Sequence, residues 1–276
     1  MTGSKNVVFD IVGTLVSYDV LFDAIDTQLG DRLRAEGIKP SLLGYTWIEV
    51  AEREYTYLSL SGQYKTFATC LELLFWRMLK MAGIQDPRSF ATKSDLEFIM
   101  SRYAKLGLRP GAAECVTKLR DAGFTVWALT AGDAARVGGY FANAGLEWPA
   151  ENLKSCDSQG IGKPDLRVYQ PLFEQLSQHG QPWFAAGHMW DVSAARRAGG
   201  AYCTIWEKEP IVELFGEMEV MAETLPAMAD KIIRGDAGSG SDIESDKNIS
   251  FVLETPLAFY ALHNNKILVL IPMITA

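Results

Sequence analysis

The sequence predicts an α/β protein in which a Rossmann-like, doubly wound parallel sheet carries an inserted all-helical cap domain and a C-terminal extension. Three observations lead to this fold class. In the second half of the chain, short apolar runs alternate with helical stretches of roughly 10–15 residues, which is the pattern of parallel βαβ units. A long region of helical periodicity separates the first apolar run from the others, and a segment rich in Gly, Ser and Asp follows the last.

The first predicted element is a strand over residues 6–12, because this short Val-rich run is followed by turn residues, as in a fully buried parallel strand. Residues 18–107 then form the predicted cap. Apolar positions in the cap recur three and four apart, and a glycine ends each stretch, so we expect helices there. The predicted cap helices span residues 19–37, 43–62 and 64–83.

After the cap, helices and strands alternate again. The predicted elements are helices over 108–123, 134–145, 164–180 and 191–199, and strands over 124–130, 182–188 and 201–207, with a loop before residue 164. Residues 1–17 and 108–234 are therefore predicted to form the sheet-containing core. Residues 235–276 are predicted to be a poorly ordered extension, because they begin with a linker rich in Gly, Ser and Asp.

Composition narrows the class of partner. The chain has 276 residues and a formal net charge of −8, and no Lys/Arg cluster forms the basic face that nucleic acid requires. The N-terminal apolar run is too short for a signal peptide, and the last one is too short to span a bilayer. The four cysteines are far apart, which predicts reduced thiols. We expect a cytoplasmic protein with a small-molecule substrate and no nucleic-acid or membrane partner, and leave a homodimer open.

Polar residues at predicted strand ends are the first candidates for a site. In open α/β sheets, ligands bind beyond the carboxyl ends of the strands. Asp10 and Thr130 end two strands, while His188 and Asp191 follow a third. Lys163 precedes a Pro-Asp pair that suits the start of a helix.

These residues lie in four motifs, FDIVGTL, ALTAGD, GKPDLRVY and GHMWD, whose order resembles that of the haloacid dehalogenase-like (HAD) hydrolase superfamily. The resemblance covers about residues 6–234. It implies that Asp10 is a nucleophile that forms a covalent ester, which water then hydrolyses. It also implies that Lys163 is the supporting cation beside Asp10 and Asp191. A carboxylate becomes a usable nucleophile when it is oriented and partly desolvated near a cation.

The residue two places after the nucleophile separates branches of this superfamily. Phosphatases carry a second Asp there as a general acid and base, whereas this chain has Val12. The chain therefore most resembles the (S)-2-haloacid dehalogenase branch, which places an uncharged residue at this position. The cap segment EYTYLSLSGQY, the spacing from Lys163 to Tyr169, and the pair Trp190 and Asp191 also resemble that branch.

The chain also departs from the branch. Glu49 stands where the branch carries a cap arginine that binds halide and carboxylate, and Arg53 lies one helical turn further on. His188 replaces an asparagine and is predicted to orient or deprotonate the hydrolytic water, with a structural histidine as the alternative. The predicted substrate-binding residues are Thr14, Thr130, Ala131, Arg53, Tyr169 and Trp190, and core packing is the alternative role for Tyr169.

The predicted function is that of a 2-haloacid dehalogenase-like hydrolase acting on a small organic acid or metabolite, without a cofactor. Mg²⁺ is the alternative, since Asp10 and Asp191 offer hard oxygen ligands. Two other functions stay open at this point. A phosphate- or phosphonate-directed relative would need a Schiff-base lysine in the cap, for which Lys65 and Lys80 are candidates. A non-catalytic binding protein with the same fold is the second.

Overall fold

The computed structural model describes residues 5–178, 180–199, 202–206, 211–238, 261–263 and 266–268. The chain divides into one unit up to Ala237 and another from Gly238 onwards. The second unit contains strands β9 (Ala261–His263) and β10 (Lys266–Leu268), which pair antiparallel. The rest of the predicted extension after residue 238 lies outside the described residues.

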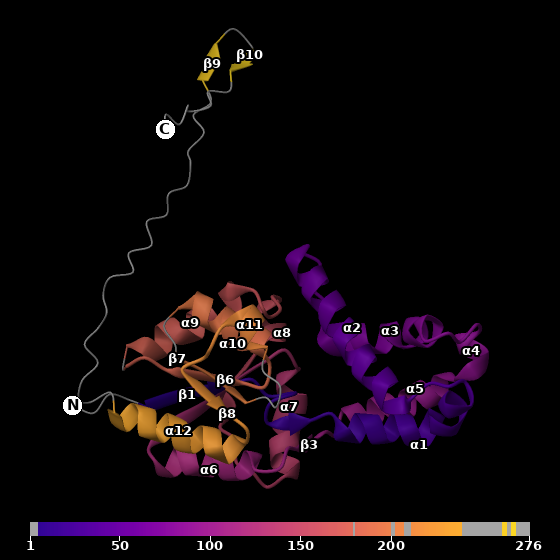
Figure 1. The fold of residues 1–276 in the computed structure, drawn as a ribbon, viewed down its shortest axis with the longest axis horizontal. Helices are drawn as coiled ribbons and strands as arrows, with labels where there is room; N and C mark the ends of the chain where they lie inside the picture. Colours follow the sequence, from indigo (N-terminus) through magenta and orange to yellow (C-terminus); the bar gives the residue numbers. More distant parts are fainter. Residues whose placement is uncertain are drawn as a thin grey trace. The chain divides into compact units, whose positions relative to one another are not determined.

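The first unit is built on a parallel six-stranded sheet with the order β5-β4-β1-β6-β7-β8 (Figure 1). The strands are β1 (Lys5–Phe9), β4 (Phe124–Thr130), β5 (Leu153–Ser155), β6 (Trp183–Ala186), β7 (Tyr202–Trp206) and β8 (Val220–Ala222). Strand β1 lies between β4 and β6, so the carboxyl ends of these three strands meet at one edge. The predicted doubly wound α/β core is confirmed.

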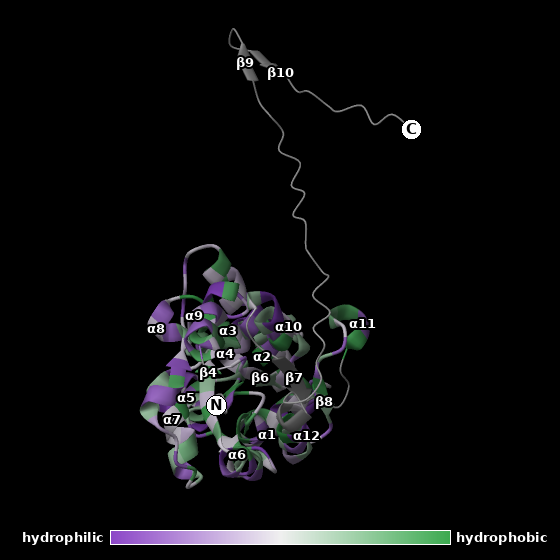
Figure 2. Cartoon of the chain, turned by 90° about the vertical axis from the view of Figure 1, so that its left-hand side faces the viewer, coloured by the Kyte–Doolittle hydropathy of each residue, from purple (hydrophilic) through white to green (hydrophobic). Residues whose placement is uncertain are grey.

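Helices cover both faces of the sheet (Figure 1). Strand side chains alternate between the faces, so Val7 and Phe9 pack into one core and Val8 into the other. The first core includes helices α6 (Ala112–Asp121), α7 (Ala134–Asn143) and α12 (Leu225–Gly238), and the second includes α9 (Leu166–Ser177) and α10 (Met189–Ala198). Mixed colours on the outer helices in Figure 2 fit this amphipathic role.

The cap consists of five helices that stand beside the sheet-containing core (Figure 1). They are α1 (Asp19–Ala35), α2 (Pro40–Leu60), α3 (Phe67–Met81), α4 (Pro87–Phe90) and α5 (Lys93–Tyr103). Buried aromatic residues hold them together; for example, the Trp47 ring lies 5.2 Å from that of Phe75. The chain enters and leaves the cap through the short antiparallel pair β2 (Val16–Ser17) and β3 (Gly107–Leu108), so both cap connections are anchored together.

Several predicted boundaries differ from the structure. Strand β1 ends at Phe9, since the chain turns after Asp10 into the loop that contains Gly13 and Thr14. The predicted loop before residue 164 contains strand β5, the turn η1 (Ala150–Asn152) and helix α8 (Cys156–Gln159), which are too short to give a periodic signal. Helix α12 continues past residue 234, where the core was predicted to end. The described part of the chain also contains α11 (Val212–Phe215), and none of its helices has the length and apolar character of a membrane span.

Candidate functional site

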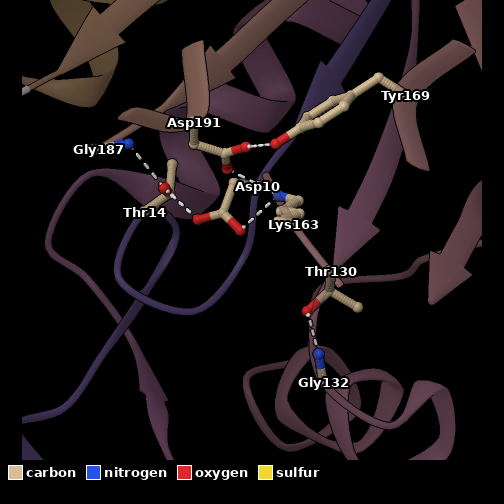
Figure 3. A network of polar contacts seen from close by, with 8 residues as sticks. All are labelled: Asp10, Thr14, Thr130, Gly132, Lys163, Tyr169, Gly187 and Asp191. Atoms are coloured by element: carbon tan, nitrogen blue, oxygen red, sulfur yellow. Dashed lines mark hydrogen bonds and ion pairs between the residues drawn. The ribbon is translucent and has the colours of Figure 1, made fainter. Parts of the chain in front are cut away.

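Three charged side chains meet at the carboxyl ends of β1 and β6. Lys163 Nζ lies 3.0 Å from Asp10 Oδ1 and 2.7 Å from Asp191 Oδ2, so one ammonium bridges two carboxylates (Figure 3). The Lys163 side chain is 1% exposed and that of Asp191 is 0% exposed, whereas 10% of the Asp10 side chain remains accessible. Asp10 is therefore the carboxylate of this group that a ligand can reach.

Each of these residues is supplied by a different element. Asp10 directly follows β1, and its backbone N–H donates to Ala185 O on β6 at 2.9 Å. Lys163 lies in the loop before α9, whose N-terminus is capped by Asp165 through the Arg167 N–H. Asp191 lies in the first turn of α10, which begins at Met189 rather than at residue 191 as predicted. The switch point of the sheet thus brings together residues far apart in sequence.

The second oxygen of Asp10 is oriented by the loop that follows it. Thr14 Oγ1 donates to Asp10 Oδ2 at 2.6 Å and accepts from Gly187 N at 2.7 Å (Figure 3). Gly13 has φ +96°, and a Cβ there would lie 2.5 Å from His188 Cε1, so this position requires glycine. The Asp10 carboxylate is therefore held from both sides before any ligand arrives.

Asp191 is fixed on both oxygens, because Tyr169 Oη donates to its Oδ1 at 2.5 Å while Lys163 holds its Oδ2. Burial raises the pKa of Asp191, and nearby Asp10 adds to this effect, although Lys163 opposes it. Burial alone would lower the pKa of Lys163, but Asp10 and Asp191 raise it above its ordinary value. The ammonium is therefore charged throughout the neutral pH range.

A cavity of about 290 Å³ lies over Asp10, between the core and the cap. The predicted site residues that line it are Asp10, Arg53, Thr130, Ala131, Lys163, His188 and Trp190. Val12, Gly132 and aromatic residues of the cap complete much of the remaining wall. The cap side combines aromatic side chains with charged residues of α2, so a few polar groups converge on a mostly apolar cavity, as in many ligand sites.

The other predicted residues lie behind this wall. Thr14, Tyr169 and Asp191 are each 0% exposed and do not line the cavity. Thr14 and Tyr169 contact the carboxylates of Asp10 and Asp191 instead, although the sequence analysis assigned both to substrate binding. The geometry gives them a supporting position, because a ligand in the cavity would meet Asp10 first.

The floor of the cavity next to β4 is shaped by Thr130. Its hydroxyl accepts from Gly132 N at 3.0 Å, and Ser155 Oγ donates to Gly132 O at 2.7 Å (Figure 3 shows the first of these bonds). His188 lies on the opposite side, with its ring 5.8 Å from that of Trp190 and nearly parallel to it. Both histidine roles considered from the sequence stay open, because His188 lines the cavity and is also packed.

Helix α2 of the cap is tied to the loop that carries Lys163. Thr56 Oγ1 donates to Lys163 O at 3.3 Å, and Gly162 N donates to Ser59 Oγ at 2.8 Å. Glu49, Glu52, Arg53 and Thr56 all line the cavity and are spaced as one helical face. This side of α2 is therefore turned toward Asp10.

Glu52 is the functional candidate that the sequence analysis missed. Burial, together with the charges of Glu49, Asp10 and Asp191, raises its pKa to about 8, although Lys163 opposes the shift. The signal was present in the sequence as the spacing of Glu49, Glu52 and Arg53 on one helical face. That spacing alone does not distinguish a solvated face from a cavity wall.

Among the described residues, no group of three or more His, Cys, Asp or Glu side chains is arranged to hold a metal ion. Asp10 and Asp191 are instead joined through Lys163 Nζ. Neither Lys65 nor Lys80 lines the cavity, and Lys80 Nζ donates to Gln85 O at 2.7 Å on the cap surface. The lysine chemistry of a phosphonate-directed relative therefore has no candidate from the cap in this cavity.

Comparisons with known proteins agree with the four motifs. The family model described as haloacid dehalogenase-like hydrolase matches residues 5–199. The chain is 25% identical over 196 residues to (S)-2-haloacid dehalogenase 4A of Burkholderia cepacia, covering 70% of this chain and 78% of the relative. It is 26% identical over 218 residues to (S)-2-haloacid dehalogenase 2 of Pseudomonas sp. (strain CBS-3), covering 77% and 88%.

The fold has similar solved structures. L-2-haloacid dehalogenase from Xanthobacter autotrophicus matches with a TM-score of 0.66 and 20% sequence identity, covering 84% of this chain and 99% of that one. The predicted resemblance to this branch is confirmed.

Proposed function

This chain belongs to the haloacid dehalogenase-like hydrolase family, and on that premise we propose that it hydrolyses a small 2-haloacid-like organic acid through an ester on Asp10. A carboxylate oxygen of Asp10 attacks the carbon that bears the halogen, and the halide leaves with the bonding electrons. Water then attacks the carboxyl carbon of the ester, which releases a 2-hydroxy acid and restores Asp10. The (S)-2-haloacid dehalogenases to which the chain is similar support this reaction type.

The observation that carries this proposal is an accessible Asp10 beside a buried ammonium, with Val12 on the wall of the same cavity. Lys163 lies against one Asp10 oxygen and Thr14 against the other, so the nucleophile is oriented and partly desolvated. A halide departs as an anion and needs no protonation, so the absence of an acid at Val12 is compatible with this leaving group.

The cavity wall suggests how the substrate is oriented. The Arg53 guanidinium is the cap cation on the wall, and its Nη2 lies 3.1 Å from Glu54 Oε1. We propose that Arg53 pairs with the substrate carboxylate, while Thr130, Ala131 and Trp190 form the surface against which the substrate packs. Glu49 on the same wall restricts the position of an anionic group, because like charges repel.

The alternatives are weighed by the same geometry. A phosphate- or phosphonate-directed activity lacks a lysine from the cap in the cavity. Mg²⁺-dependent catalysis would place the ion against Asp10 and Asp191, whose carboxylates are each already paired with Lys163 Nζ. A non-catalytic binding protein would not need Asp10 to be held by Lys163 and Thr14.

The cytoplasmic location and the homodimer stay predictions.

Single-turnover hydrolysis in ¹⁸O-labelled water, with a panel of 2-haloacids and acyl phosphates, tests the proposal. We expect a 2-haloacid to leave ¹⁸O in the Asp10 carboxylate, detected by mass spectrometry of the peptide that contains it, with and without a chelator. Asp10→Asn should abolish turnover, and circular dichroism should show that the variant is still folded although one partner of the Lys163 ion pair is lost. Label that depends on an acyl phosphate and Mg²⁺ would instead favour the phosphate-directed alternative.

A further inference from the structure

Glu52 projects from cap helix α2 onto the wall of the Asp10 cavity. It makes no hydrogen bond or ion pair with any residue in the described part of the chain. Its carboxyl group is nevertheless coupled electrostatically to the charges of Asp10, Asp191 and Lys163. A partly buried carboxyl with no protein partner, aimed at a reactive site, is available for proton transfer.

The carboxylate next to Lys163 is poorly placed for the same task. Asp191 is 0% exposed and does not line the cavity, and its two oxygens are bonded to Tyr169 and Lys163. Water in the cavity therefore cannot reach it without a rearrangement of this network. His188 does line the cavity, but its ring is packed between Gly13 and Trp190.

We infer that Glu52 is the proton acceptor for the water that hydrolyses the ester on Asp10. The inference rests on the proposed function and adds a catalytic residue to it. In the ester-forming step, Asp10 displaces the halide and Glu52 gives up its proton to solvent. In the second step, water attacks the ester carbonyl and passes one proton to Glu52. The bond between the Asp10 carboxyl carbon and the alcohol oxygen then breaks, that oxygen takes the second water proton, and the 2-hydroxy acid leaves as Asp10 regains its charge. The two steps together consume one water and release one halide and one proton.

The charge on Asp10 controls when Glu52 acts. In the free protein the Asp10 carboxylate is one of the charges that raise the pKa of Glu52. Ester formation neutralises Asp10 and removes that contribution, while the substrate carboxylate is present both before and after this step, so the pKa of Glu52 is lower in the ester than in the substrate complex. Glu52 is therefore mainly protonated while substrate binds and becomes a base when water must be activated.

Other titratable groups face the same space and must be separated from Glu52 in any pH profile. They are Glu49, Arg53, Tyr55 and Tyr57 on α2, Tyr18 before α1, Tyr103 on α5, and Asp10, Lys163 and His188 from the core. Burial raises the pKa values of Tyr18 and Tyr103 above their ordinary values, so neither ionises near pH 8. The substitution His188→Gln tests whether His188, and not Glu52, produces the pH profile.

The test compares Glu52→Gln, Glu52→Asp and His188→Gln with the unmodified chain, using (S)-2-chloropropionate as the probe. Rapid-quench mass spectrometry of the intact protein measures the ester, and steady-state kcat is recorded from pH 5 to 9. Glu72→Gln on cap helix α3 is the control, because Glu72 is exposed and does not line the cavity. Thermal denaturation confirms that each variant is folded.

We expect E52Q to accumulate the Asp10 ester, to lower kcat by roughly 10²- to 10⁴-fold, and to lose the rise of kcat with pH. The unmodified chain and E72Q should keep that rise, and E52D should restore part of the rate. If E52Q keeps both the rate and the pH profile, or if H188Q accumulates the ester in its place, the inference is wrong while the proposed function stands. If the unmodified chain forms no ester on Asp10, both fail.

Discussion

Replacing Lys163 by methionine tests whether its ammonium holds the site together. Methionine has a similar length but no charge, so Asp10 and Asp191 would lose the cation that lies 3.0 and 2.7 Å from them. Removing one partner of a buried ion pair typically costs about 3–5 kcal/mol, because an uncompensated charge stays buried. We expect K163M to lose a free energy of unfolding of this size at pH 8 and to have no measurable turnover.

The loss should depend on pH with a definite sign. Burial already raises the pKa of Asp191, and removing Lys163 removes the charge that opposes this shift. A carboxyl whose folded pKa lies above its unfolded value of about 3.9 destabilises the fold progressively as pH rises from the unfolded pKa to the folded pKa. The deficit of K163M relative to the unmodified chain should therefore shrink when pH falls from 8 to 5.

Urea unfolding followed by circular dichroism at pH 5 and pH 8 measures both effects. Lys118→Met is the control, since the Lys118 side chain is 36% exposed and its ion pairs with Glu114 and Asp230 lie at the surface. We expect a much smaller and less pH-dependent change there. A K163M deficit below about 1 kcal/mol at pH 8 would refute the buried-pair reasoning, since surface pairs alone reach that size. An equal deficit at both pH values would refute the argument that the folded pKa of Asp191 is raised in K163M.

Three further outcomes follow from the structure. Gly13→Ala should destabilise the fold and lower kcat, because its Cβ would lie 2.5 Å from His188 Cε1 at φ +96°; unchanged melting temperature and kinetics would contradict this. Thr14→Val should lower the rate of ester formation by roughly tenfold or more, by removing the 2.6 Å bond to Asp10, and single-turnover kinetics measures that rate. A chain ending at Gly238 should keep its melting temperature within a few degrees, whereas one lacking helix α12 should fail to fold, as thermal denaturation would show.

The fold class was predictable because its signals are long and periodic. The cap helices repeat apolar positions over many residues, and strands such as β4 are continuous apolar runs bounded by turns. Strands β2, β3 and β5 have two or three residues each, so their sequence carries no period, and pairing with a neighbour defines them. Tertiary contacts therefore decided the elements that the sequence analysis missed.

The candidate site was predictable to the extent that strand ends converge. Asp10, Lys163 and Asp191 meet because β1, β6 and the loop before α9 end at one edge of the sheet. Which residues face the cavity was less predictable, because Thr14 and Tyr169 are polar and adjacent to the motif residues yet point behind them. A motif identifies the neighbourhood of a residue, whereas its hydrogen-bond partner determines the direction of its side chain.

The loop after β1 has Val12 where a second acid could stand, and the cap supplies the carboxyl group of Glu52 to the same cavity. An acid two residues after Asp10 would come from the same loop as the nucleophile, whereas Glu52 comes from cap helix α2 and lines the cavity over Asp10. The Thr56 and Ser59 bonds to the loop of Lys163 hold α2 in that position. In the proposed mechanism the nucleophile comes from the core and its base from the cap, so water activation by Glu52 depends on the position of α2 relative to Asp10.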